Sequence, residues 1–96
     1  MPLIAATLSC TGAVQGVGFR MLVVKMARQL GLTGWVRNED DSTVAIFAVG
    51  RREQIEKLAG LLRGVNSTMG PKVSAVEITG GKEMEKSPFP TFDIGQ

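Results

Sequence analysis

The sequence predicts an α+β domain in which two helices cover one face of an antiparallel sheet. Three observations support this fold class. Segments rich in β-compatible residues are separated from one another by glycines, prolines and short polar turns. Two further segments carry apolar residues at helical spacing. Along the chain the segments follow the order strand, helix, strand, strand, helix, strand, which is the split βαβ, or ferredoxin-like, arrangement.

The first half of the chain predicts two strands joined by a helix. Leu3 to Thr11 is rich in β-compatible residues and ends at a glycine, so we expect a strand there. Gly34 to Asn38 is the second predicted strand, and Trp35 within it is expected in the core. Between them a helix follows Arg20 and stops at Gly31, with apolar positions at Met21, Val24, Ala27 or Arg28, and Leu30.

The second half predicts a hairpin partner, a helix and two further strands. The acidic segment Glu39 to Ser42 is typical of a turn, and a strand follows it from Val44 to Gly50. Arg52 to Gly64 is an amphipathic helix, because one stripe collects Ile55, Leu58, Ala59 and Leu62. The remaining expectations are a loop over Val65 to Lys72, a strand over Val73 to Ile78, a connection over Gly80 to Pro90 and a short closing strand at a sheet edge over Phe92 to Ile94.

Length and composition limit the chain to one domain over residues 1–96. The residues are 44% hydrophobic and 21% charged, and the formal net charge is +2. This weak positive charge attracts small anions but lacks the dense basic stripe of a nucleic-acid binder. The longest apolar run, Val44 to Val49, is too short to cross a bilayer. We therefore expect a soluble protein with neither a nucleic-acid nor a membrane partner. We also expect a monomer.

Cysteine and histidine usage argues against thiol and metal chemistry. Cys10 is the single cysteine, and the chain has no histidine. An internal disulfide is thereby excluded, a cytoplasmic location is expected, and no metal or cofactor is predicted. The first ten residues superficially resemble an export signal but lack its positively charged start. Without a histidine to activate it, Cys10 is expected to be a buried, unreactive strand residue.

The segment Gly12 to Arg20, which reads GAVQGVGFR, is the candidate functional site. Gly16 and Gly18 adopt positive φ at low cost, so successive backbone N–H groups can converge on one anion. Phe19 can anchor the loop, while Arg20 supplies a permanent charge and a planar fork of donors that fits two phosphoryl oxygens. We therefore predict a phosphate pocket at the start of the first helix.

Two blocks of the sequence together resemble the signature of the acylphosphatase family. They are Gly12-x-Val14-Gln15-Gly16-Val17-Gly18-Phe19-Arg20 and Leu30-Gly31-Leu32-x-Gly34-Trp35-Val36-Arg37-Asn38. The resemblance implies hydrolysis of acyl phosphates to a carboxylate and inorganic phosphate, without metal or cofactor. By the same resemblance Arg20 would bind phosphate, or sulfate in its place, and Asn38 would hold the attacking water. The backbone amides around the anion would be those of Gln15, Gly16, Val17, Gly18, Phe19 and Arg20.

The chain departs from the family pattern beside both blocks. Family members commonly have Asp-Gly in the hairpin after the matching asparagine, whereas this chain has Asp41-Ser42. This difference predicts another turn geometry and leaves the exact aim of Asn38 open. The acidic run Glu39 to Asp41 could repel an anionic substrate or form a solvated turn, and we expect the solvated turn. Met21 stands where an aromatic residue often follows the arginine, and we expect it to alter packing more than chemistry.

Two other functions are compatible with parts of this sequence. The same module begins larger hydrogenase-maturation carbamoyltransferases, where it resembles a domain that handles carbamoyl phosphate. In those proteins a cysteine-rich zinc-binding region follows, and nothing here resembles it. An RNA-binding sheet of similar topology would need paired aromatic residues, whereas only 5% of this chain is aromatic. Acyl phosphate hydrolysis is therefore the preferred hypothesis.

Overall fold

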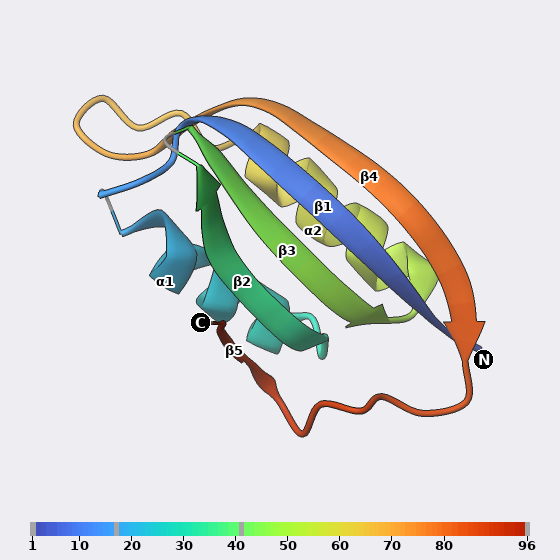
Figure 1. Ribbon diagram of the computed structural model, residues 1–96. Coiled ribbons are helices and arrows are strands. Elements are labelled where there is room, and N and C mark those ends of the chain that lie inside the picture. The colour runs from blue at the N-terminus through green and yellow to red at the C-terminus, as the bar shows by residue number, and fades with distance from the viewer. Residues whose placement is uncertain (1, 17, 41, 96) are drawn as a thin grey trace.

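Two helices pack on one face of a five-stranded sheet in the computed structural model, which describes residues 2–16, 18–40 and 42–95 (Figure 1). The strand order is β4-β1-β3-β2-β5. The predicted ferredoxin-like α+β fold is confirmed. In chain order the elements are β1 (Leu3–Ala13), α1 (Phe19–Gln29), β2 (Thr33–Asp40), β3 (Thr43–Gly50), α2 (Arg52–Arg63), β4 (Lys72–Met84) and β5 (Phe92–Ile94).

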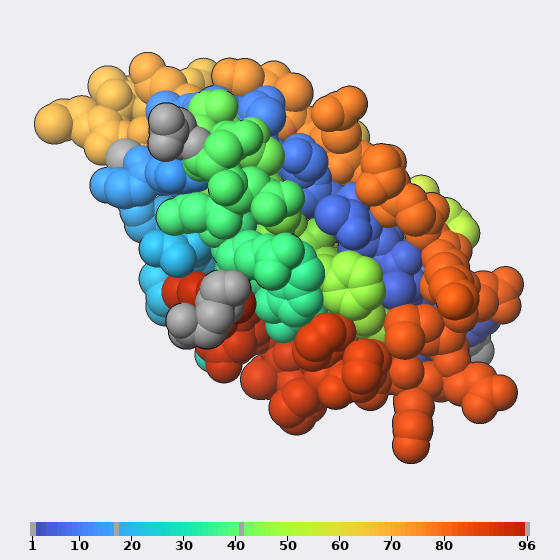
Figure 2. Space-filling model, viewed as in Figure 1, coloured from blue at the N-terminus to red at the C-terminus, as the bar shows by residue number. Residues whose placement is uncertain are grey.

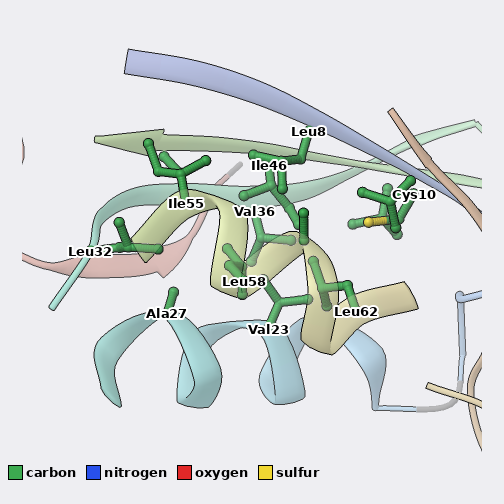
Figure 3. Close-up of a cluster of buried hydrophobic side chains, with 14 of the residues drawn as sticks. Leu8, Cys10, Val23, Ala27, Leu32, Val36, Ile46, Ile55, Leu58 and Leu62 are labelled. Atoms are coloured by element: carbon green, nitrogen blue, oxygen red, sulfur yellow. The ribbon is translucent and has the colours of Figure 1, made fainter. Parts of the chain in front are cut away.

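The core lies between the sheet and the helices, because the strands bury alternate side chains. Successive strand residues point to opposite faces, and in β1 the buried set is Ile4, Ala6, Leu8 and Cys10. Figure 3 shows Leu8 and Ile46 of the sheet on the side that faces α2. The stripe predicted for α2 is confirmed, since the helix buries Ile55, Leu58, Ala59 and Leu62.

The apolar stripe of α1 differs from the prediction. Met21, expected on the inner side, is 61% exposed, whereas the buried residues are Phe19, Val23, Val24 and Ala27. The helix begins at Phe19, whose ring is itself anchored in the core. Residues two apart on a helix do not share a face, so an inward Phe19 turns Met21 outward.

β4 is longer than predicted and includes the glycine pair at which we expected it to end. It runs from Lys72 to Met84 and pairs antiparallel with β1 over its whole length. Gly80 and Gly81 have φ values of 89° and 111°, and the register shifts at this point between Ala5 and Ala6. The glycines therefore form a bulge inside the ladder instead of terminating it.

The closing strand Phe92–Ile94 is confirmed, and it pairs parallel to β2 in an otherwise antiparallel sheet. Its Phe92 is fully buried. Arg28 of α1 holds this strand, because its Nε donates to the Phe92 carbonyl at 2.8 Å and its Nη2 lies 3.5 Å from an Asp93 carboxylate oxygen. β5 thereby covers the edge of β2 and brings the C-terminal segment against α1.

Trp35 lies outside the core, so the prediction for it is wrong. Val36, its neighbour, points to the helices and is fully buried, which sends Trp35 to the opposite face. There Trp35 stacks on Phe47 with ring centroids 5.8 Å apart, and Phe89 meets Phe47 edge-on. The sheet face away from the helices thus carries a pair of aromatic residues. This overturns the argument that a chain with 5% aromatic residues lacks such a pair. Figure 2 shows the red C-terminal segment along the lower edge of this face.

Candidate active site

Two glycines of the loop after β1 have the positive φ that the sequence predicts. Gly16 and Gly18 have φ values of 71° and 76°, in the left-handed region, and open space surrounds the Cβ position of each. The preference for glycine here therefore comes from backbone conformation and not from crowding. Gly18 is the N-cap of α1, and among the described residues no side chain caps that end. The first N–H groups of the helix are available to an anion.

Arg20 lies in a cavity of about 110 Å³ beside this loop. Its volume is well below the roughly 300 to 1,000 Å³ of pockets that enclose drug-sized ligands, so it suits a small group such as a phosphoryl. Arg20 is half-buried and is the charged residue of the lining. The cavity is formed by Val14, Gly16, Gly18, Phe19, Arg20, Met21 and Ile94.

Val17, one of the predicted amide donors, lies outside the described residues. The other predicted members of the loop converge on one end of the sheet. Phe19 is 1% exposed and anchors the start of α1 in the core, as expected. Its burial fixes where the helix begins and therefore where Arg20, the next residue, emerges. Gln15, at the start of the loop, is half-buried.

Asn38 is an exposed residue near the end of β2 and is not part of the cavity lining. It pairs with Val44 of β3, and the register shifts between Asn38 and Asp40. The end of β2, the start of β3 and the loop before α1 lie at the same end of the sheet (Figure 1). Topology thus places the strand of Asn38 and the loop before Arg20 at the same end of the sheet.

Hydrogen bonds join the glycine loop directly to the β2–β3 hairpin. The Gln15 side chain donates from Nε2 to the Asp40 carbonyl and, at 3.1 Å, to the Thr43 carbonyl. Ahead of the loop, at the end of β1, Gly12 N–H donates to the Ser42 carbonyl at 3.2 Å. The sequence suggested only a backbone role for Gln15. Nothing in its spacing identifies these acceptors, because they are main-chain carbonyls that any residue would provide.

The turn predicted over Glu39 to Ser42 is shorter than expected, because β2 continues through Glu39 and Asp40. The end of the hairpin is locally ordered. Asp40 Oδ1 accepts a hydrogen bond from Ser42 N–H at 2.9 Å. This bond, followed by one from the Thr43 side chain, lowers the pKa of the Asp40 carboxyl from its ordinary 3.8. Asp40 is therefore a turn-forming carboxylate that stays ionised at neutral pH.

We expect the Asp40 carboxyl to titrate below pH 3.8, because its hydrogen bonds favour the charged form. A lowered folded-state pKa means that these bonds stabilise the hairpin above the unfolded-state pKa and are lost as the pH falls through the folded-state value. NMR titration of the carboxyl carbon measures this, and the Ser42 amide shift should follow the same curve. Asp40→Asn should abolish that pH dependence of the Ser42 amide. A carboxyl midpoint at or above 3.8 would contradict the assignment.

Cys10 is fully buried between the sheet and α2 (Figure 3). Burial raises the pKa of its thiol to about 11, despite an opposing effect of Arg63. The predicted burial of Cys10 is confirmed, and the raised pKa leaves the thiol protonated at neutral pH. Among the described residues no three His, Cys, Asp or Glu side chains form a metal-binding group. In the same ranges no helix has the length and apolar character needed to span a bilayer.

We expect the Cys10 thiol to react with a disulfide reagent more than about 100-fold more slowly in the folded protein than in urea, because reaction requires opening of the core. Absorbance of the released thiolate at pH 8 measures both rates. The urea-unfolded protein serves as the control for intrinsic reactivity. Equal rates in the two states would show that Cys10 is accessible.

Comparisons with known proteins point to one family. The family Acylphosphatase matches residues 6–94. The chain is 46% identical to the acylphosphatase of Pasteurella multocida over 66 residues, which cover 69% of this chain and 68% of that protein. It is 33% identical to the acylphosphatase of Archaeoglobus fulgidus over 92 residues, or 96% and 98% of the two chains. The acylphosphatase structure from Coxiella burnetii has a TM-score of 0.80 at 31% identity and covers 98% of this chain and 94% of that one.

The fold is also similar to one part of a much larger protein. Full-length HypF, in its phosphate- and nucleotide-bound form, has a TM-score of 0.79 at 26% identity. The match covers 100% of this chain but 12% of HypF. The same arrangement of strands and helices therefore occurs as a small portion of a longer chain.

Proposed function

The chain belongs to the acylphosphatase family of hydrolases, and from this we propose that its glycine loop, Arg20 and Asn38 together hydrolyse acyl phosphates to a carboxylate and inorganic phosphate. The observation that supports this most directly is the cavity of about 110 Å³ in which Arg20 lies beside two left-handed glycines. The Gln15 hydrogen bonds support it further, because they join this loop to the strand that carries Asn38.

In this proposal the phosphoryl group is bound by the loop and by Arg20. The guanidinium offers a planar pair of donors to two phosphoryl oxygens. Backbone N–H groups of Gln15, Gly16, Val17, Gly18, Phe19 and Arg20 surround the remaining charge, and the open N-terminus of α1 adds its partial positive charge. The cavity accommodates the phosphoryl group, so the acyl group lies at its mouth and is weakly selected.

The reaction is attack of water on phosphorus. The Asn38 carboxamide holds the water in line with the acyl oxygen, the new P–O bond forms, and the bond from phosphorus to the acyl oxygen breaks. The carboxylate leaves with the electron pair, and both protons of the water stay on the phosphate. A carboxylate is a weakly basic leaving group and needs little general-acid help. Positioning and electrostatic stabilisation of a loose transition state therefore account for the catalysis.

Steady-state hydrolysis of acetyl phosphate by the purified chain, in chelator and beside a phosphate monoester, tests the proposal. We expect turnover of the acyl phosphate and negligible turnover of the monoester, because only the former has a good leaving group. Inorganic phosphate should inhibit competitively. Absence of acyl phosphate turnover by folded protein would overturn the proposed activity.

A second candidate is a module that binds a carboxyl phosphate or carbamoyl phosphate for a longer protein. The likeness to a 12% portion of HypF favours it. The same assay separates the two candidates. For this purpose the assay includes carbamoyl phosphate beside acetyl phosphate. Binding of phosphate or carbamoyl phosphate without hydrolysis of acetyl phosphate or carbamoyl phosphate would favour the module.

A further inference from the structure

The Gln15 side chain spans the tip of the β2–β3 hairpin. Its amide nitrogen has two hydrogens, and the two acceptors are the carbonyls of Asp40 on β2 and Thr43 on β3. Asp40 and Thr43 are themselves register partners across the hairpin. One side chain from the glycine loop is therefore hydrogen-bonded to both strands at one residue pair of the ladder.

The pair Asp40–Thr43 is next to Asn38 in the ladder. The pair before it in the ladder is Asn38 with Val44, and the register shifts between the two pairs. A register shift places one extra residue on a strand and locally bends it, so the direction of Asn38 depends on how the bend is held. The Gln15 contacts act on the far side of this bend, two residues from Asn38.

Two other hydrogen bonds near the turn do not link the hairpin to the loop residues that follow β1. Asp40 Oδ1 and Ser42 N–H close the turn within the hairpin itself and hold nothing to the loop. Gly12 N–H reaches the Ser42 carbonyl, but this bond lies at the end of β1 and ahead of the glycine loop. Among residues 2–16, 18–40 and 42–95, the hydrogen bonds between the loop that follows β1 and the hairpin come from the Gln15 side chain.

We infer that the Gln15 side chain is a positioning residue, which sets the separation between the phosphate-binding loop and the Asn38 carboxamide. This inference rests on the proposed function. In this proposal the side chain acts through the hairpin backbone, because both of its hydrogen bonds go to main-chain carbonyls of the hairpin. A misplacement of about 1 Å between reacting groups can cost on the order of 100-fold in rate, so a contact of this kind influences turnover more than binding.

The first test compares Gln15→Met with Gln29→Met, a matched change at an exposed glutamine at the other end of α1. Methionine keeps an unbranched side chain of similar length but removes the donor. We expect Gln15→Met to lower kcat by about tenfold or more, with the inhibition constant of phosphate within about twofold of the parent. Gln29→Met should leave both values unchanged. An unchanged kcat, or a parallel loss of kcat, phosphate binding and melting temperature, would overturn the inference.

The second test is a double-mutant cycle with Asn38→Ala. If Gln15 acts through Asn38, Gln15→Met should lower the residual rate little further in the Asn38→Ala background. A full tenfold loss in that background would overturn the positioning role. Should Asn38→Ala alone leave kcat intact, the proposed catalytic role of Asn38 fails separately. Amide exchange at Ser42 and Thr43 gives a readout independent of activity, and it should accelerate in Gln15→Met but not in Gln29→Met.

Discussion

Replacing Arg20 with alanine is expected to lower kcat/KM by roughly two to three orders of magnitude, equivalent to about 3 to 4 kcal/mol of transition-state stabilisation. Arg20 is the charged residue of a cavity whose other walls are backbone and apolar side chains. Its loss removes the guanidinium from the proposed phosphoryl site, so phosphate inhibition should weaken as well. Steady-state kinetics with acetyl phosphate and inorganic phosphate measure both effects.

Two further variants make the Arg20 result specific. Arg20→Lys keeps the charge but removes the planar fork, and we expect it to recover only part of the lost activity. Arg52→Ala removes an equally charged but exposed residue at the start of α2 and should leave the kinetics unchanged. Near-normal turnover by folded Arg20→Ala would refute the assigned role.

Replacing Asn38 with alanine is expected to lower kcat by about two orders of magnitude while phosphate inhibition changes little. The carboxamide is proposed to orient water, which matters in the transition state, and it lies outside the lining of the Arg20 cavity. Asn38→Ala should therefore lower kcat and leave the inhibition constant of phosphate nearly unchanged. A defect in the phosphate-binding loop should instead weaken inhibition by phosphate.

Asn66→Ala is the matched control for Asn38→Ala. Asn66 is also exposed, and it lies in the connection between α2 and β4. It should show parental kinetics. Loss of phosphate inhibition with preserved kcat in Asn38→Ala would reverse the two proposed roles and show that Asn38 binds the anion.

Local sequence patterns predicted the helices, the strands and the loop conformation well. The stripe of α2 was correct because residues three and four apart share a helix face whatever the helix packs on. The positive φ of Gly16 and Gly18 was also correct, because it reflects the steric freedom of each residue alone. The closing strand at Phe92–Ile94 was placed correctly between prolines and the chain end.

Predictions that depended on a distant partner were less accurate. Met21 is exposed, contrary to the prediction from its spacing, because the burial of Phe19 sets the rotation of α1. The strand at β4 continued through Gly80 and Gly81 because β1 offered a ladder that absorbed the bulge. The apolar character of Trp35 predicts a place in the core. Because Val36 is buried on the face of the sheet that packs on the helices, its neighbour Trp35 points to the opposite face.

The sequence by itself determined the order and type of the elements, the left-handed glycine loop and the family to which the chain belongs. These follow from short-range sterics, from periodicity and from a signature of two short sequence blocks. Only the tertiary structure decided that β5 runs parallel to β2, and that the Gln15 side chain joins the loop to Asp40 and Thr43. Both are contacts between residues far apart in the chain, and in the case of Gln15 the acceptors are backbone carbonyls, which carry no mark of residue identity.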